Sequence, residues 1–311
     1  MWIATIFFPR RQIVLSPFSV ASMSHSSSPD ELPLTVVEAD RGWQGSGLGE
    51  LWRYRELLYF FAWRDVKVRY KQTELGAAWA ILQPLLTTLV FVVLFQVILS
   101  EGKEPTIPGL PYVLATLAGM LPWQLFAESL SRASESLMEA QNLITKVYFP
   151  RVLLPTSAVI GSLVDFVIGL GVLAAIMLFY GRAPSWTLIT LPAFVLLAAL
   201  ASLAAGLWLA SLSAVYRDFR YVQPFLIRLG MFLSPVVYPT LQLEGKLPDW
   251  ALLLYGLNPM VAAIEGFRWA LFGTPLPGPL VMLPSIGATA ALLVGGLYFF
   301  QRMETTVVDV I

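Results

Sequence analysis

Long stretches without a charged residue constrain this chain more than any other feature. A helix that crosses a membrane needs about 20 mainly apolar residues. Six parts of the sequence supply such stretches: 75–100, 105–127, 152–181, 183–216, 221–243 and 269–301. The third contains only Asp165 and the fifth only Arg228, and about residues 281–300 of the last would span. The sequence therefore predicts an all-α integral membrane protein with six transmembrane helices.

The composition agrees with a membrane environment and excludes several classes of function. Apolar residues make up 57% of the 311 residues and charged residues only 13%, against about 45–50% and about 25% in soluble domains. The net charge is zero, which gives no electrostatic reason to expect nucleic-acid binding. Cysteine is absent and His25 is the single histidine. We therefore expect no metal site, no cofactor in this chain and no catalytic residue of the Cys or His type.

The basic residues indicate how the chain is oriented, because cytoplasmic loops carry an excess of Lys and Arg. With six spans and a cytoplasmic N-terminus, sixteen of the twenty basic residues fall in cytoplasmic segments. The external segments hold only Lys103, Arg182, Lys246 and Arg268. We expect a multi-pass protein of the plasma (bacterial inner) membrane with both termini in the cytoplasm.

Three regions are predicted along the chain. Residues 1–48 are expected to be an N-terminal tail that is either disordered or mis-started, with Met23 as the true first residue. A signal peptide is not expected, because the basic Arg10-Arg11 pair follows the apolar start instead of preceding it. Residues 49–74 are expected to form an amphipathic helix in the cytoplasmic interface. In that helix Arg64 and Lys67 fall on one side and Phe61 on the other. Residues 75–311 form the six-span domain.

Residues 250–272 are apolar but do not read as a span. Asn258-Pro259 divides them into two halves, and Glu265 and Arg268 lie in the second half. Two half-length apolar pieces favour re-entrant or interfacial helices between spans five and six. Asn258 is suited to cap the second half-helix, and Glu265 and Arg268, three residues apart, can pair on one helix face.

The sequence contains no G-x-x-x-x-G-K-[ST] motif, so the chain lacks a P-loop of its own. Coupling to an ion gradient would need ionisable groups within the spans, and Asp165 is the main candidate. A lone carboxylate is more often a packing residue bonded to a serine or a backbone carbonyl. Both interpretations of Asp165 stay open at this point.

Five blocks of residues resemble the membrane subunit of type-two ATP-binding-cassette exporters, in the family that exports polysaccharides and polyol phosphates (O-antigen, capsule, teichoic acid). The blocks are RDVKVRYKQTELGAAWAILQP (64–84), QNLITKVYFPR (141–151), YRDFRY with FLSPVVYP (216–239), LNPMVAAIEGFRWALFG (257–273) and RMETTVVDVI (302–311). They occur in the order and at the spacing of the family, over about residues 50–311. One departure is mild: Val307 and Val308 stand where the family usually has Phe-Ala.

The resemblance implies a homodimer of permease subunits with two copies of a separate P-loop ATPase subunit, which would bind ATP and Mg. It implies that the interfacial helix and the loop helix at 134–148 meet the ATPase, and that the half-helices at 250–272 form an external gate around Asn258, Pro259, Glu265 and Arg268. The residues we expect at the ATPase contact are Arg64, Lys67, Asn142, Lys146, Tyr148 and Arg151. The implied substrate is a lipid-linked glycan or polyol-phosphate polymer.

Aromatic rings suit a conduit for sugars, because their faces make C–H contacts with sugar rings while allowing them to slide. The channel-lining candidates are Trp79, Phe91, Phe95, Phe225, Phe232 and Tyr238. The alternatives are export of a smaller lipid or drug by a related permease and, in another class, an ion-coupled secondary transporter that uses Asp165. A membrane-embedded enzyme such as a glycosyltransferase would need paired acids or a metal cluster, which the sequence does not offer.

Overall fold

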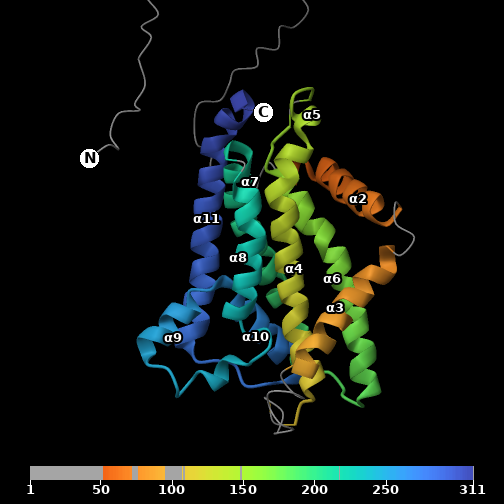
Figure 1. Cartoon of the computed structure of the whole chain (residues 1–311), viewed down its shortest axis with the longest axis vertical. Coiled ribbons are helices and arrows are strands. Elements are labelled where there is room, and N and C mark those ends of the chain that lie inside the picture. Colours follow the sequence, from red (N-terminus) through yellow and green to blue (C-terminus); the bar gives the residue numbers. More distant parts are fainter. Residues whose placement is uncertain are drawn as a thin grey trace, which may run out of the picture. The chain divides into compact units, whose positions relative to one another are not determined.

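The computed structural model describes residues 52–71, 76–94, 107, 109–147, 149–216 and 218–310, and these residues form helices without a β-strand (Figure 1). The predicted tail at 1–48 lies outside the described residues. The α-helices are α2 (Arg55–Lys71), α3 (Gly76–Phe91), α4 (Tyr112–Glu139), α5 (Gln141–Ile144), α6 (Leu153–Phe179), α7 (Leu191–Val215), α8 (Phe219–Leu233), α9 (Asp249–Gly256), α10 (Pro259–Phe272) and α11 (Pro279–Val310). Two 3-10 turns, η2 (Trp186–Thr190) and η3 (Thr240–Gln242), precede α7 and α9.

Four helical segments of the described chain are long and apolar enough to cross a membrane: α4, α6, η2 with α7, and α11 as far as Met303. The shortest of them has 25 residues, which at about 1.5 Å per residue exceeds a hydrocarbon core of about 30 Å. Helices α9 and α10 pass the same test together but are bent by 90° at their junction. The protein is therefore an all-helical membrane protein with four candidate spans, or five if the bent pair is counted as one.

The first and fifth predicted spans contain shorter helices. Helix α3 has 16 residues and continues in a π-helical turn to Leu94, where the described part stops. Helix α8 has 15 residues and would be about 22 Å long, which is less than the hydrocarbon thickness. The count of six spans thus stays a prediction.

Helix α4 differs from the prediction at both of its ends. It begins at Tyr112, after Pro111, and continues to Glu139, so residues 134–139 belong to the long helix and only Gln141–Ile144 form a separate turn. The prediction ended the span at residue 127 because charges follow. Arg132 and Glu128 are one turn apart, and the Arg132 Nε donates to the Glu128 carboxylate at 2.9 Å. Glu and Arg are good helix formers, and their pairing at this spacing stabilises the helix where it continues past residue 127.

The helices alternate in direction, and two apolar clusters mark the opposite ends of the bundle. At one end, Phe61 of α2 and Phe149 pack with the last turns of α4 and α7 and with Phe300 of α11. At the other end, α9, α10 and the first turn of α11 meet around Leu252 and Val281. Figure 1 shows α2 and α5 at one end and α9 and α10 at the other. The C-terminal ends of α4 and α11 therefore lie at the same end of the bundle as α2.

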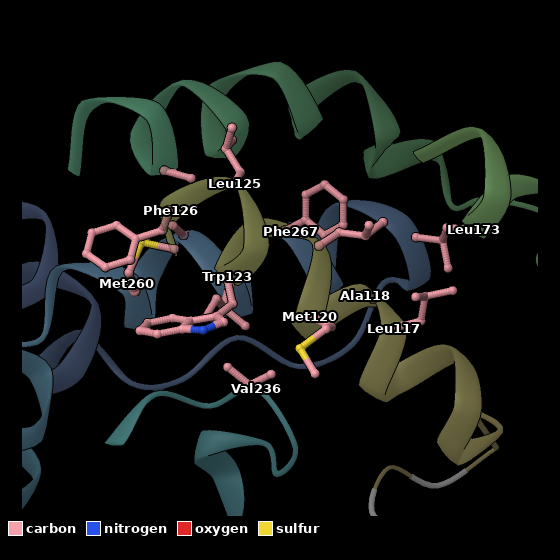
Figure 2. Close-up of a cluster of buried hydrophobic side chains, with 14 of the residues drawn as sticks. Leu117, Ala118, Met120, Trp123, Leu125, Phe126, Leu173, Val236, Met260 and Phe267 are labelled. Carbon is pink, nitrogen blue, oxygen red and sulfur yellow. The ribbon is translucent and has the colours of Figure 1, made fainter. Parts of the chain in front are cut away.

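The centre of the bundle is built around α4. Figure 2 shows Leu117, Met120 and Trp123 of α4 among the side chains of a core that also includes Phe267 of α10 and Val236 of the α8–η3 connection. On the other side of α4, a Cβ at Gly206 of α7 would lie closer than 3.0 Å to Ala133 of α4. Small residues at such crossings let two backbones approach closely.

The side chains of α2 follow the predicted two-sided pattern. Tyr54, Leu58 and Phe61 belong to the apolar cluster at this end of the bundle, whereas Arg64 and Lys67 are exposed. A second exposed edge carries aromatic rings, with Tyr59 and Trp63 stacked 6.5 Å apart. The helix therefore presents a buried apolar face, a charged face and an aromatic edge.

Candidate functional site

Helix α10 is a short helix held in the interior, with eleven of its 14 residues buried. Its N-terminus is capped as the sequence predicts: the Asn258 side chain accepts a hydrogen bond from the Met260 amide at 2.9 Å, and Pro259 takes the first helical position. The Asn258 Nδ2 also donates to the Ser234 hydroxyl at 2.8 Å and to the Leu233 carbonyl at 3.2 Å. Asn258 therefore links α10 to the end of α8.

The C-terminal carbonyls of α10 are satisfied by a neighbouring segment. The Ser185 amide donates to the Leu271 carbonyl at 2.9 Å, and the Thr187 hydroxyl lies 3.0 and 3.1 Å from the carbonyls of Trp269 and Ala270. Gly273 ends the helix with φ +66°, a left-handed conformation that favours glycine. Both ends of a buried helix are thus paired, which removes the cost of unsatisfied backbone groups.

The two charged residues of α10 pair as predicted and are almost fully buried. The Arg268 Nη1 lies 3.4 Å from the Glu265 Oε1, and the two side chains are only 1% and 4% exposed. The same carboxylate oxygen accepts from Thr240 of η3, from its amide at 2.6 Å and from its hydroxyl at 2.8 Å. A buried ion pair needs such additional hydrogen bonds to offset its desolvation.

The Arg268 guanidinium connects three elements of the fold. Its Nε donates to the Ala115 carbonyl of α4 at 3.0 Å, its Nη2 donates to the Val236 carbonyl, and its Nη1 lies 3.5 Å from the Tyr238 carbonyl. Residues 234–239 are not helical, so the carbonyls of Val236 and Tyr238 do not receive the hydrogen bonds that a helix would give them. Arg268 supplies those partners and attaches the α8–η3 connection to α4 and α10.

Gly119 of α4 makes room for this guanidinium, and the sequence contains no signal of it. A Cβ at this position would lie closer than 3.0 Å to the Arg268 Nη2 and to the Val236 carbonyl. A glycine in an apolar helical run is compatible with many kinds of packing. Only the fold places Gly119 opposite Arg268, 149 residues further along the chain.

Asp165 has partners that differ from the expected serine or backbone carbonyl. Its carboxylate forms an ion pair with Arg69 of α2 and accepts a hydrogen bond from the Tyr70 hydroxyl. The Arg69 Nη1 also lies 3.9 Å from the Glu128 carboxylate of α4. Arg69 and Asp165 are far apart in the sequence, so the sequence could not predict that they pair. The pair of Glu128 and Arg132 could have been predicted from their i, i+4 spacing.

The electrostatics of this network follow from its partial burial. Burial lowers the pKa of the Arg69 guanidinium, and the nearby positive charge of Arg132 lowers it further. Burial raises the pKa of the Tyr70 phenol. The raised pKa of Tyr70 keeps its hydroxyl protonated, as a donor of the hydrogen bond to Asp165.

The predicted ATPase-contact residues lie on two segments that the fold brings to one end of the bundle. Phe61 of α2 makes an edge-on contact with Phe149, which follows α5, at 5.4 Å between ring centroids. Arg64 pairs with its neighbour Asp65 at 2.9 Å. The other candidates are distributed as follows: Lys67, Asn142 and Lys146 are exposed, Arg151 is half-buried, and Tyr148 lies outside the described residues.

The six aromatic candidates for a channel lie in different environments. Phe91 is 7% exposed and belongs to the core cluster, whereas the Tyr238 hydroxyl donates to the Phe232 carbonyl at 3.0 Å. The rings of Trp79, Phe225 and Phe232 are exposed on α3 and α8. Phe95 lies outside the described residues. Their role in a channel stays a prediction.

No cluster of three or more His, Asp or Glu side chains suited to hold a metal ion occurs among the described residues. The charged groups of both sites are instead paired with one another or with backbone groups. Such an arrangement holds helices together, and it can also release them if a conformational change separates the partners.

Comparison with known proteins identifies the family. Residues 56–272 match the sequence profile of the ABC-2 type transporter family. The chain is similar to the O-antigen export system permease protein RfbA of Myxococcus xanthus, with 32% identity over 257 residues, which are 82% of this chain and 96% of the relative. A relative of the same name from Klebsiella pneumoniae is 27% identical over 68% of this chain and 79% of its own length. The polysialic acid transport protein KpsM of Escherichia coli is 25% identical over 67% and 78%, respectively. The chain belongs to the ABC-2 type transporter family.

Proposed function

We propose that this chain is the permease subunit of an exporter that moves a polysaccharide, carried on a lipid, from the cytoplasm across the plasma membrane. The observation that carries the proposal is the alignment with the O-antigen export permease of Myxococcus xanthus, which extends over 96% of that relative. A second relative transports polysialic acid, so a long glycan is the substrate chemistry shared by the relatives. The energy would come from a separate P-loop ATPase that binds ATP and Mg.

The topology that we propose has six spans, with α3 and α8 forming parts of the first and fifth. In this arrangement α2 and the C-terminal end of α11 lie on the cytoplasmic side, and α9 and α10 lie on the external side. The two apolar clusters at opposite ends of the bundle support this assignment, because one unites α2 with the later turns of α4 and α11. The excess of basic residues at the α2 end supports it as well.

The ATPase is proposed to dock where α2 and residues 141–151 meet. The Phe61–Phe149 contact joins these segments, so a force applied to one is transmitted to the other. Lys67 and Lys146 give this surface a positive edge, and Arg64 lies on the same surface, paired with Asp65. Homodimerisation, which the family resemblance implies, would then place two such surfaces above two ATPase subunits. The candidates for a sugar conduit are Trp79, Phe225, Phe232 and Tyr238.

Helices α9 and α10 are proposed to gate the external end. Their 90° bend at Asn258 and Pro259 keeps both halves at one end of the bundle. Arg268 attaches α10 to the α8–η3 connection through the carbonyls of Val236 and Tyr238. Breaking the hydrogen bonds from Arg268 would free residues 236–238 from α10, while Glu265 would stay bonded to Thr240.

The test of the proposed function is complementation. A strain of the source organism that lacks this gene should lose surface polysaccharide and accumulate the lipid-linked glycan inside, and the plasmid-borne chain should restore export. Affinity purification in mild detergent should recover a P-loop ATPase in equal amount. Wild-type surface polysaccharide in the deletion strain, or recovery of the chain alone with transport unaffected by ATP depletion, would refute the proposal.

Two alternatives have less support. Export of a smaller lipid or drug would leave the match to glycan-exporting relatives unexplained. Ion coupling through Asp165 would need a carboxylate that exchanges its counter-ion during transport. Here Arg69 and Tyr70 already compensate that carboxylate, which favours a structural role for Asp165.

A further inference from the structure

A cavity of about 410 Å³ lies between α2, α3, α4 and α6, at the corner where α2 leads into α3. It is separate from the contacts of α10 described above. Its volume falls within the range of small-molecule sites, about 300–1,000 Å³. Trp79, whose ring is 55% exposed, forms part of its wall.

The charges that line the cavity cancel. Arg69 is paired with Asp165, and Arg132 with Glu128, so two cations and two carboxylates face the same space. The two carboxylates would repel a phosphate group, and the guanidinium groups that could bind it are already paired. The two guanidinium groups would in turn repel a cation. The balanced charge therefore favours a neutral ligand that can both donate and accept hydrogen bonds.

The cavity also holds two amide side chains, Gln83 of α3 and Gln124 of α4. Within the described residues neither side-chain amide makes a hydrogen bond to another protein group. An amide offers two donors and an acceptor, and the Tyr70 hydroxyl in the same wall adds a further polar atom. Gln124 and Tyr70 are half-buried and Gln83 is exposed. An acyl chain would leave the half-buried amide of Gln124 unpaired, which is costly.

We infer that this cavity binds an uncharged sugar unit of the exported glycan, with the Trp79 ring against a sugar face and Gln83 and Gln124 bonded to sugar hydroxyls. The inference rests on the proposed function and deepens it, because it names a binding site within one subunit. Aromatic rings, amides and carboxylates are the groups that bind the C–H face and the hydroxyls of a sugar. The volume admits about one or two sugar rings.

The position of the cavity gives such a site a purpose. It adjoins Arg69 and Tyr70 at the end of α2, the helix proposed to contact the ATPase. A sugar bound there would bridge α3 and α4 through Gln83 and Gln124, next to the ion pair that attaches α2 to α6. The ligand would thus bind where α2, α3, α4 and α6 meet.

The experiment uses the full chain purified with its ATPase and labelled with 5-fluorotryptophan. The probe is glycan released by mild acid from the surface polysaccharide of the source organism and separated from lipid. The ¹⁹F resonance of Trp79, assigned by its loss in Trp79→Phe, should shift in a saturable way. The resonance of Trp186, which is 86% exposed on η2, should not shift.

Substitutions identify the groups that bind. Gln83→Leu and Gln124→Leu should each weaken the binding measured from Trp79 by about tenfold, which is the loss expected when a polar contact of about 1.4 kcal/mol is removed. Gln242→Leu, at an exposed position on η3, is the matched control and should leave binding unchanged.

Three outcomes would overturn the inference: an unshifted Trp79 resonance, unchanged affinity in both glutamine variants, or a shift produced by inorganic pyrophosphate that competes with the glycan. Each should be read beside export in cells. If the wild-type chain restores surface polysaccharide and the Trp79 resonance does not shift, only the proposed sugar site is refuted. If the wild-type chain does not restore export, the proposed function itself fails.

Discussion

Replacing Gly119 with alanine should damage the contact that holds the α8–η3 connection in place. The added methyl group would lie closer than 3.0 Å to the Arg268 Nη2 and to the Val236 carbonyl. The carbonyl belongs to the backbone and the guanidinium is bonded to the Ala115 and Val236 carbonyls. Neither atom can move away without breaking a hydrogen bond that Arg268 makes.

The expected cost follows from the two effects of the methyl group. Overpacking of a filled interior costs about 1–3 kcal/mol, and loss of the charged hydrogen bond from Arg268 to Val236 adds about 1.5–3 kcal/mol. Replacing glycine with alanine inside a helix returns about 1 kcal/mol. The net loss in the free energy of unfolding should therefore be about 1.5–5 kcal/mol.

The measurement is an SDS titration of the purified complex in mixed micelles, with the free energy of unfolding taken from the helical circular dichroism signal. The matched control is Gly171→Ala in α6, where an added Cβ has no described atom within 4 Å. That variant should be as stable as the wild type or more stable by up to about 1 kcal/mol.

If Gly119→Ala and Gly171→Ala have the same stability, Gly119 does not face Arg268 as the structure places it. Arg268 would then not link α4, α10 and the α8–η3 connection in the way described above. Loss of stability in both variants would point instead to a general effect of alanine in these helices, and would equally contradict the reasoning.

Further predictions concern the three polar clusters. Arg268→Gln should destabilise the chain by about 3–5 kcal/mol because it leaves Glu265 charged and buried. The double variant Glu265→Gln with Arg268→Gln should recover part of that loss in the same titration. If export survives in the double variant, the pair has no gating role. Asn258→Ala should cost about 0.5–2 kcal/mol through loss of the cap, and Asn258→Asp, which keeps the accepting oxygen, should cost less. Asp165→Asn and Arg69→Gln should each reduce export and the free energy of unfolding, and exchanging the two residues should restore both. If the exchanged variant regains its stability but not its export, ion coupling through Asp165 is favoured instead.

Much of the local structure was predictable because it depends on neighbours in the sequence. The long apolar runs, with at most one charged residue each, include those that correspond to the candidate spans α4, α6, α7 and α11. The division at Asn258-Pro259 corresponds to the 90° bend between α9 and α10. Capping by Asn258 and the Glu265–Arg268 pair are contacts between residues two or three apart. Each of these features is determined by helical geometry and solvent preference alone.

The limit of α4 was predicted incorrectly for an instructive reason. The charge-free run ends at residue 127, but the helix continues, and Glu128 and Arg132 compensate each other within it. A count of charges treats each one as a cost, whereas the energy depends on whether the charge is paired. The i, i+4 spacing contained the necessary information.

The sequence by itself determined that the chain is helical and apolar enough to lie in a membrane, where four of its long apolar helices fall, and where the bent pair is divided. Only the tertiary structure decided which distant groups meet: Arg69 with Asp165, Arg268 with the carbonyls of Ala115 and Val236, and Gly119 with the guanidinium that needs its space. The physical reason is one of range. Helix periodicity and transfer from water act on residues within a few turns, whereas a buried charge takes whatever partner the packing of other helices brings within hydrogen-bonding distance.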